Sequence, residues 1–301
     1  MLILFIPWIL LLGILVILLC CLCRKWKVAI LLTLLIITAN WYFRLIPLSA
    51  LNNQKAESVR VMTFNIDGSR QDSLSIKRIA RIILHENADF VFIGEDFQNI
   101  VRELQNELTD VYPYTTNKFR GSAHYLYSKT PIGTYERLGT DMTSYLFHYT
   151  ISCGNDSLHF YGCHLASNNY TEQNDYVHPD SLTESNEVIQ YLKDISNASG
   201  RRSKEVDVLL DAVKYNQGNA IILGDFNDIS GSAPLNKIEC AGFTDAWWKG
   251  GNGYGATIHH PLPYRIDHIF YNEGLKLKSI RKVDSHGVSD HDALVAEFWV
   301  E

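Results

Sequence analysis

The first 23 residues contain no charged side chain, and this apolar run constrains the fold more than any other feature of the sequence. As an α-helix at ~1.5 Å per residue, such a run covers roughly 34 Å, enough to cross the ~30 Å hydrocarbon core of a bilayer. The basic segment Arg24-Lys25-Trp26-Lys27 ends the run, and a second apolar run, Val28–Phe43, follows it. We therefore predict a two-span transmembrane anchor over residues 1–51 and a polar linker over residues 52–58.

The basic turn between the two runs predicts how the anchor is oriented. Lys and Arg concentrate in cytoplasmic loops, so we expect Arg24–Lys27 in the cytoplasm and residues 52–301 on the extracytoplasmic side of the membrane. A signal sequence and a pair of buried core helices are the alternatives. A cleaved signal fits less well, because no Lys or Arg precedes the first run and no small-residue cleavage site follows it.

The charged residues are divided between the same two parts of the chain. All 33 acidic residues follow Leu51, together with 23 of the 27 basic residues, so residues 52–301 carry a net charge of −10. This balance disfavours a protein that holds nucleic acid mainly by counterion release, but it is compatible with a nuclease that has a local basic rim or a metal-filled cleft. With 47% hydrophobic and 20% charged residues, the chain is unlike disordered, collagenous or disulfide-stabilised proteins.

Strand and helix patterns alternate from residue 59 to the end, with no internal repeat and no linker, so residues 59–301 are expected to form one α/β domain. Helices are expected near residues 76–83 and 100–108, and two more are expected at Leu182–Ile195 and Lys204–Tyr215. The expected strands are Val59–Asn65, Phe90–Glu95, His124–Ser128, Tyr145–Ile151, Ser157–His164, Ala220–Leu223, Arg265–Tyr271, Leu275–Val283 and Ala293–Val300.

Polar side chains recur at the ends of these apolar strands. Each has an ordinary structural explanation when taken alone, as a turn residue, a solvated strand end or a hydrogen-bonded core histidine. Ligands of α/β proteins collect at loops off strand ends, so the repetition of the pattern predicts one converging site. The residues concerned are Asn65, Glu95, His164, Asp225, Asn227, Asp267, Asp290 and His291.

The segments that carry these residues resemble, in order, the motifs of the endonuclease/exonuclease/phosphatase superfamily. The resemblance covers residues 59–301 and implies a DNase I-like fold, a four-layer α/β/β/α sandwich with the site at one rim. The pairing of Gly-Asp-Phe-Asn with a C-terminal Ser-Asp-His is its most specific part. The matching segments are Thr63-Phe64-Asn65, Gly94-Glu95, Cys163-His164-Leu165, Gly224-Asp225-Phe226-Asn227, Arg265-Ile266-Asp267 and Ser289-Asp290-His291.

The resemblance also implies a divalent metal. Glu95 would hold the ion, helped by Asn65, and Asp290 would act as a direct or water-mediated ligand. Oxygen ligands suit a hard cation, so Mg²⁺ is expected, with Mn²⁺ as the other candidate. Here Gly94 stands before Glu95 where the family usually has Gln, and Asp96 follows, which would re-aim the ligand or let Asp96 substitute for it.

The remaining residues would perform the hydrolysis. Asp225 and Asn227 would position and activate the attacking water, and His164 would donate to a phosphate oxygen. His291 would pair with Asp267, which fixes its tautomer. Negative charge gathers on the phosphoryl oxygens during in-line attack, which is why imidazolium, amide and metal donors suit the reaction. The sequence leaves open whether Asp225 or His291 is the general base.

These implications predict a membrane-anchored, divalent-metal-dependent phosphoesterase that cuts phosphodiester bonds. The expected substrate is a nucleic acid or a phospholipid head group, the membrane is bound through residues 1–51, and no protein partner is inferred. The alternative is a non-catalytic binding or scaffold protein that retains the fold.

Overall fold

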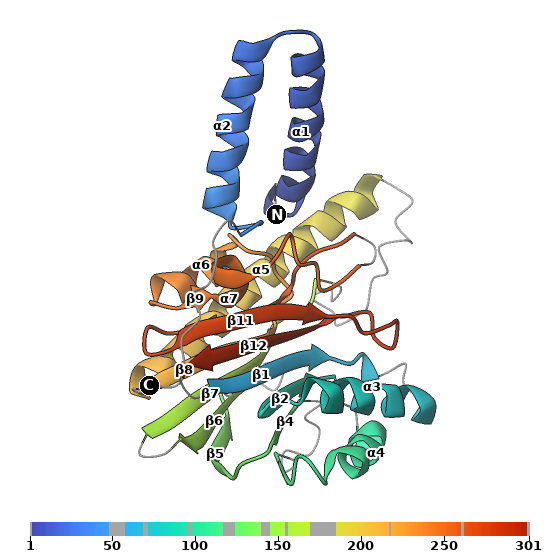
Figure 1. Cartoon of the computed structure of the whole chain (residues 1–301), viewed down its shortest axis with the longest axis vertical. Helices are drawn as coiled ribbons and strands as arrows, with labels where there is room; N and C mark the ends of the chain where they lie inside the picture. The colour runs from blue at the N-terminus through green and yellow to red at the C-terminus, as the bar shows by residue number, and fades with distance from the viewer. Residues whose placement is uncertain are drawn as a thin grey trace.

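The computed structural model describes residues 2–47, 58–68, 72–95, 98–116, 124–139, 145–153, 156–168, 185–216, 218–259 and 262–299. Most of the predicted linker, residues 52–57, and Asp96 lie outside these ranges. The chain begins with an apolar helical hairpin that projects from an α/β domain (Figure 1). A short 3-10 helix, η1 (Leu2–Phe5), leads into α1 (Ile6–Leu22), and α2 (Trp26–Phe43) returns towards the domain.

The two hairpin helices differ as candidate membrane spans. Among the described residues, α2 is the one helix long and apolar enough to cross a bilayer, judged by its 18 residues and its composition. The first helix has 17 residues, because Pro7 lies in the first turn of α1 and the preceding residues adopt the tighter 3-10 form. Helix α2 is therefore a candidate membrane anchor or signal, and the membrane span predicted for the first apolar run, which contains α1, remains a prediction.

The strands of the described residues form two six-stranded sheets. In the first sheet the order is β11-β12-β1-β2-β4-β3, and in the second it is β5-β6-β7-β8-β10-β9. The first sheet consists of β1 (Ser58–Asn65), β2 (Phe90–Gly94), β3 (Tyr114–Thr115), β4 (Tyr125–Ser128), β11 (Lys276–Val283) and β12 (Ala293–Trp299). The second sheet consists of β5 (Ile132–Arg137), β6 (Tyr145–Cys153), β7 (Asp156–His164), β8 (Asn219–Asp225), β9 (Thr244–Asp245) and β10 (Asp267–Tyr271).

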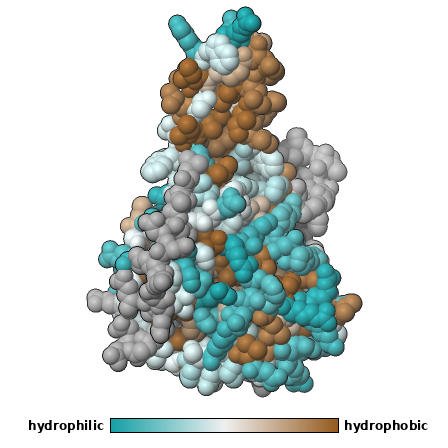
Figure 2. All heavy atoms as spheres, viewed as in Figure 1, coloured by the Kyte–Doolittle hydropathy of each residue, from teal (hydrophilic) through white to brown (hydrophobic). Residues whose placement is uncertain are grey.

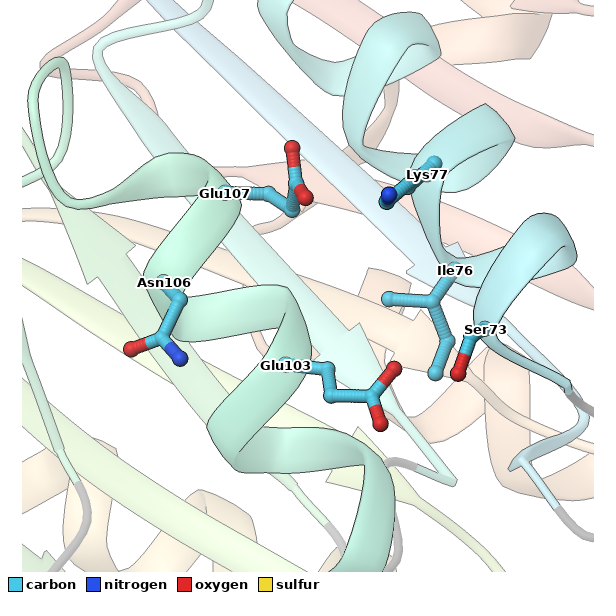
Figure 3. A pocket seen from close by; sticks show the side chains of 6 residues that line it. All are labelled: Ser73, Ile76, Lys77, Glu103, Asn106 and Glu107. Atoms are coloured by element: carbon cyan, nitrogen blue, oxygen red, sulfur yellow. The ribbon is translucent and has the colours of Figure 1, made fainter.

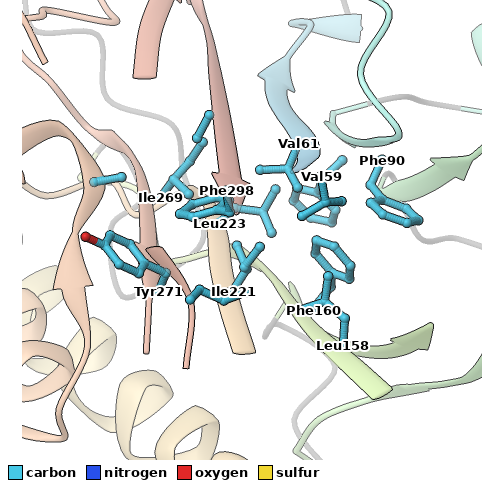
Figure 4. Packing of buried hydrophobic residues seen from close by; sticks show 14 of the residues in the cluster. Val59, Val61, Phe90, Leu158, Phe160, Ile221, Leu223, Ile269, Tyr271 and Phe298 are labelled. Carbon is cyan, nitrogen blue, oxygen red and sulfur yellow. The ribbon is translucent and has the colours of Figure 1, made fainter. Parts of the chain in front are cut away.

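The largest apolar core lies between the two sheets (Figure 4). It is built from inward-facing residues of both sheets, including Phe90, Phe160 and Phe298, none more than 3% exposed. Burying one such ring is worth roughly 1.5–3 kcal/mol relative to leaving it in water. Gly162 allows the sheets to approach, because a Cβ there would lie 2.2 Å from the ring of Phe92.

Helices cover the outer faces of both sheets and complete the four layers. Helices α3 (Ser73–Glu86) and α4 (Gln98–Leu108) pack on the first sheet, and α5 (Ser185–Tyr215) and α6 (Ala233–Cys240) pack on the second. A short helix, α7 (Ala246–Gly250), follows β9. The predicted four-layer α/β/β/α sandwich is confirmed.

The prediction of two helices at Leu182–Ile195 and Lys204–Tyr215 was wrong, because α5 runs without a break from residue 185 to 215. Glycine in a helix costs about 1 kcal/mol relative to alanine, which favours a break near Gly200. The packing of this segment outweighs that cost. Arg202 is only 2% exposed, and its Nε donates to Asp228 Oδ2 at 2.9 Å while its Nη1 donates to the carbonyl oxygen of Ala166 at 2.8 Å.

Candidate active site

The strand register brings the predicted polar residues to one edge of the sandwich. In the first sheet, β1 and β2 run parallel with Asn65 opposite Gly94, which places the following Glu95 beside Asn65. In the second sheet, β7 and β8 run parallel with His164 opposite Asp225, and antiparallel β10 places Asp267 opposite the same Asp225. The ends of β1, β2, β7 and β8 and the start of β10, five strands in all, therefore meet at this edge.

An amide links the two sheets at this edge. Asn65 Nδ2 donates to Glu95 Oε1 at 3.0 Å and to Asp225 Oδ2 at 3.2 Å, while Asn65 Oδ1 accepts from the backbone N–H of Asp67 at 3.1 Å. Glu95 has a φ of +58°, a left-handed conformation that ends β2 and turns its side chain towards the site. Two carboxylates, one beside each sheet, thus share the amide of Asn65, the last residue of β1.

His164 lies against the same two carboxylates. Its Nε2 is 3.8 Å from Glu95 Oε1 and 3.8 Å from Asp225 Oδ2, and its Nδ1 is 2.9 Å from Nε2 of His124. His124 is buried, and burial holds its pKa well below the usual 6.5, with a smaller contribution in the same direction from His164. His124 is not among the residues predicted for the site, and its only signal in the sequence is its position at the start of a predicted strand.

His291 and Asp267 form the second buried pair of the site. His291 Nδ1 lies 2.7 Å from Asp267 Oδ2, and His291 Nε2 lies 3.8 Å from Asp225 Oδ2. Burial lowers the pKa of His291, but the carboxylates of Asp267, Asp225 and Asp290 outweigh it and hold that pKa well above its usual value. The surrounding carboxylates therefore favour the charged form of the imidazole, and Asp267 fixes one of its ring nitrogens.

The other two predicted residues are placed differently. Asn227 has a φ of +50°, its backbone N–H donates to Asp225 Oδ1 at 2.8 Å, and its Nδ2 donates to the carbonyl oxygen of Leu165 at 2.9 Å. Its amide therefore braces the loop after β8. Asp290 is exposed at the rim beside His291. Ser289, also outside the predicted set, accepts from the N–H of His291 and donates to the backbone oxygen of Asn65.

The donor set fits a divalent cation. Among the described residues, Asp225, Asp267 and His291 each offer a ligand atom within 4.8 Å of the others. Within the described part of the chain, Asp267 Oδ1 is buried and has no hydrogen-bond partner. Glu95 adds a further carboxylate beside Asp225 through the shared Asn65 amide. The carboxylate oxygens of Glu95 and Asp225 are hard donors that suit Mg²⁺ or a similar cation, whereas Nδ1 of His291 is already held by Asp267.

A separate hollow of about 250 Å³ lies between α3 and α4 (Figure 3). Its lining contains none of the eight predicted site residues; Lys77 faces Glu107 across it, beside Ile76. The chemistry-bearing groups therefore gather at the strand ends and away from this hollow.

The fold is similar to those of several solved structures. Caenorhabditis elegans TDP2 matches with a TM-score of 0.60 and 18% identity, over 81% of this chain and 75% of that one. D. rerio TDP2 in complex with a single-strand DNA product matches with a TM-score of 0.60 and 16% identity, over 80% and 99% of the two chains. The beta toxin of Staphylococcus aureus matches with a TM-score of 0.53 and 14% identity, over 81% and 100%. At these identities the likeness establishes the fold.

No curated protein matches this chain significantly. A family model described as the endonuclease/exonuclease/phosphatase family matches residues 62–291, which contain the whole site from Asn65 to His291. With the DNase I-like fold and this match, the chain belongs to the endonuclease/exonuclease/phosphatase family, whose enzymes are hydrolases acting on phosphate esters.

Proposed function

We propose that the protein is a membrane-anchored, Mg²⁺-dependent phosphodiesterase. One observation carries the proposal: Asn65, Glu95, His164 and the pair Asp267–His291 all lie within hydrogen-bond or ion-pair distance of Asp225 or of one another. A scaffold that had lost activity would have no need to keep this many charged groups close together, since each buried carboxylate costs free energy unless it is compensated.

Asp225 and His291 divide the proton transfers between them in this proposal. The carboxylates around His291 raise its pKa and favour the protonated imidazole, so its Nε2 would give its proton to the oxygen of the leaving group. Asp225 Oδ2, 3.8 Å away, is then the group that accepts a proton from the attacking water. His164 Nε2, 3.8 Å from the same Asp225 Oδ2, adds a second donor. Asn227 holds Asp225 through its backbone N–H, so its role is to position the base.

Glu95 and Asn65 would hold the metal, with Asp290 at the rim as a direct or water-mediated ligand. A bound divalent cation would offset the negative charge that develops on the phosphoryl oxygens. Mg²⁺ fits the oxygen donors best, and Mn²⁺ is the other candidate. Because Asn65 Nδ2 faces two carboxylates, metal binding would require its amide oxygen to turn towards the ion.

The anchor and the charge of the domain bear on the substrate. Helices α1 and α2 are proposed as a two-span anchor, and the basic turn at Arg24–Lys27 supports an extracytoplasmic position of the catalytic domain. The net charge of −10 on residues 52–301 disfavours long polyanions. A phospholipid head group is thus favoured, and a nucleic acid is the alternative because D. rerio TDP2 was solved with single-strand DNA.

The test is hydrolysis by the purified full-length chain. A soluble phosphodiester, a phosphomonoester, DNA, RNA and phospholipid vesicles are assayed with Mg²⁺ and with EDTA. We expect metal-dependent cleavage of a diester, reduced at least ~10²-fold in Asp225→Asn and in His291→Gln. Asp211→Asn, an exposed carboxamide variant on α5, is the matched control and should retain full activity. A folded wild-type protein that cleaves none of these would favour the scaffold alternative, and near-normal turnover in either site variant would remove that residue from the mechanism.

A further inference from the structure

The start of the hairpin is attached to the loop that leads into the active site. On α1, Trp8 Nε1 donates to Tyr264 Oη at 3.2 Å, and the Tyr264 hydroxyl donates to the carbonyl oxygen of Leu4 at 3.1 Å. Tyr264 lies three residues before Asp267, the carboxylate that holds His291. One end of the membrane hairpin therefore contacts the domain beside its catalytic pair.

The end of the hairpin is attached to the same part of the domain. Trp41 packs edge-on against Trp248 of α7 with ring centroids 6.0 Å apart, and Arg44 forms an ion pair with Glu239 of α6. Trp and Tyr side chains concentrate at the level of the lipid head groups. The rings of Trp8 and Trp41 are therefore expected at the level of the lipid head groups, where the domain meets the hairpin. In Figure 2 the apolar surface of the hairpin ends at this level, while its far tip is hydrophilic.

Backbone pairing through Ile258 connects Tyr264, which contacts the hairpin, to His291 of the site. Ile258 pairs with Tyr264 on one side and with His291 on the other. Neighbouring strands lie ~4.8 Å apart, so the backbones of Tyr264 and His291 are about 10 Å apart. The Asp292 N–H also donates to the carbonyl oxygen of Thr257 at 2.7 Å. The polar head-group layer is itself roughly 5–8 Å thick on each side of the bilayer, so a site at this distance is within reach of it.

The chain between α7 and Tyr264 packs on Trp247 and carries an exposed apolar side chain, Leu262. Trp247 Nε1 donates to the carbonyl oxygen of Gly253, and Gly255 packs on the same indole with a φ of +69°, where a Cβ would lie 2.2 Å from the ring. Leu262, two residues before Tyr264, is 41% exposed. An apolar side chain next to interfacial aromatic residues is typical of a surface that meets lipid.

We propose that the face formed by Glu239, Trp248 and residues 258–259 and 262–264 docks on the lipid surface around the hairpin, and that the substrate is a head-group phosphodiester of a lipid in that membrane. This inference rests on the proposed phosphodiesterase function and membrane anchoring. The hairpin then acts as more than a tether, because its aromatic contacts fix it to Tyr264, whose backbone lies about 10 Å from that of His291. Anchoring keeps the site at a high effective concentration of membrane lipid, so the enzyme does not need high affinity for a substrate in solution. This agrees with the acidic domain, which would repel a diffusing polyanion.

Photo-crosslinking tests the docked face without requiring activity. A benzophenone amino acid replaces Leu262, or Leu74 as the matched control, in the full-length chain reconstituted in phosphatidylcholine vesicles. Leu74 lies on α3 and is 67% exposed, so it has more free surface than Leu262. We expect a lipid adduct from position 262 at least fivefold more abundant than from position 74. Equal adducts at both positions, or none at position 262, would overturn the proposed docking.

Turnover then tests the substrate. The variants Trp8→Phe, which loses the hydrogen bond to Tyr264, and Leu262→Asp should each lower hydrolysis of vesicle lipid at least fivefold relative to hydrolysis of a soluble diester. Trp26→Phe at the far end of the hairpin and Leu74→Asp should leave that ratio unchanged. A protein that cleaves the soluble diester or DNA but no vesicle lipid would refute the lipid substrate and leave the phosphodiesterase standing. Cleavage of no substrate at all would instead refute the proposed function.

Discussion

Replacing Gly162 by alanine should destabilise the domain, because the added methyl group would occupy space filled by the ring of Phe92. An ideal Cβ at position 162 lies 2.2 Å from Cε2 of that ring and 2.7 Å from Cδ2 and Cζ. Packed carbon atoms normally lie ~3.5–4.0 Å apart, so the ring or the strand must move by more than ~1 Å. Phe92 is only 1% exposed between the sheets and has no free space to enter.

Forcing extra atoms into a packed core costs about 1–3 kcal/mol, and the closeness of this contact places the expected loss near 2 kcal/mol. For a domain of this size, that loss corresponds to a fall in Tm of roughly 4–8 °C. The assay is thermal unfolding of the full-length chain in detergent, followed by near-ultraviolet circular dichroism. Gly200→Ala is the control of opposite sign: in the middle of α5 a Cβ meets no atom within 4 Å, so stability should rise by ~0.5–1 kcal/mol.

A second substitution identifies the cause. Phe92→Leu shortens the side chain that the new methyl group would meet, so in the Gly162→Ala background it should recover at least ~1 kcal/mol. Alone, it should be destabilising because it leaves a cavity between the sheets. The reasoning is refuted if Gly162→Ala unfolds at the wild-type temperature, or if the double variant is no more stable than the single one.

Three further predictions concern the buried ionisable side chains of Asp267, His124 and Arg202. Asp267→Asn should lower turnover at least ~10²-fold at pH 8 and less at pH 6, because loss of the carboxylate lowers the pKa of His291 and the imidazolium is lost as pH rises; a parallel loss at all pH values would contradict this. The folded-state pKa of His124 lies well below 6.5, so on acidification the unfolded chain binds this proton before the folded chain does. The free energy of unfolding should therefore fall as pH drops below about 6.5, by up to ~1.4 kcal/mol per pH unit. In denaturant titrations from pH 5 to 8, His124→Gln should reduce the slope of that free energy against pH. Arg202→Ala should cost ~3–5 kcal/mol because it leaves Asp228 buried without its cation, and a change in denaturation midpoint equivalent to less than 1 kcal/mol would argue against that pairing.

Much of the architecture could be predicted from local patterns. The apolar runs before residue 44 predicted a helical hairpin, and apolar strands ending in polar residues predicted one α/β site at a sheet edge. These inferences depend on neighbours within a few positions along the chain. These inferences can therefore be made from the hydrophobic period and the strand ends, without knowledge of the topology.

Long-range contacts decided what those patterns left open. The break expected near Gly200 is overridden because Arg202 reaches Asp228, 26 residues away. His124 entered the site because it pairs with His164, 40 residues further along the chain. The role predicted for Asn227 in positioning the water stays a prediction, and the structure adds that its amide donates to the carbonyl oxygen of Leu165.

Local sequence therefore specifies which segments are apolar, which are strands and which polar residues follow them, since each property resides in a short stretch of chain. The packing of the folded chain specifies which of those polar groups meet, which charges they share, and that Tyr264 joins the hairpin to the edge that holds His291. The physical reason is that hydrogen bonds and ion pairs act over ~3–4 Å, while the partners lie tens to hundreds of residues apart and are brought together only by the pairing of strands and the packing of the two sheets.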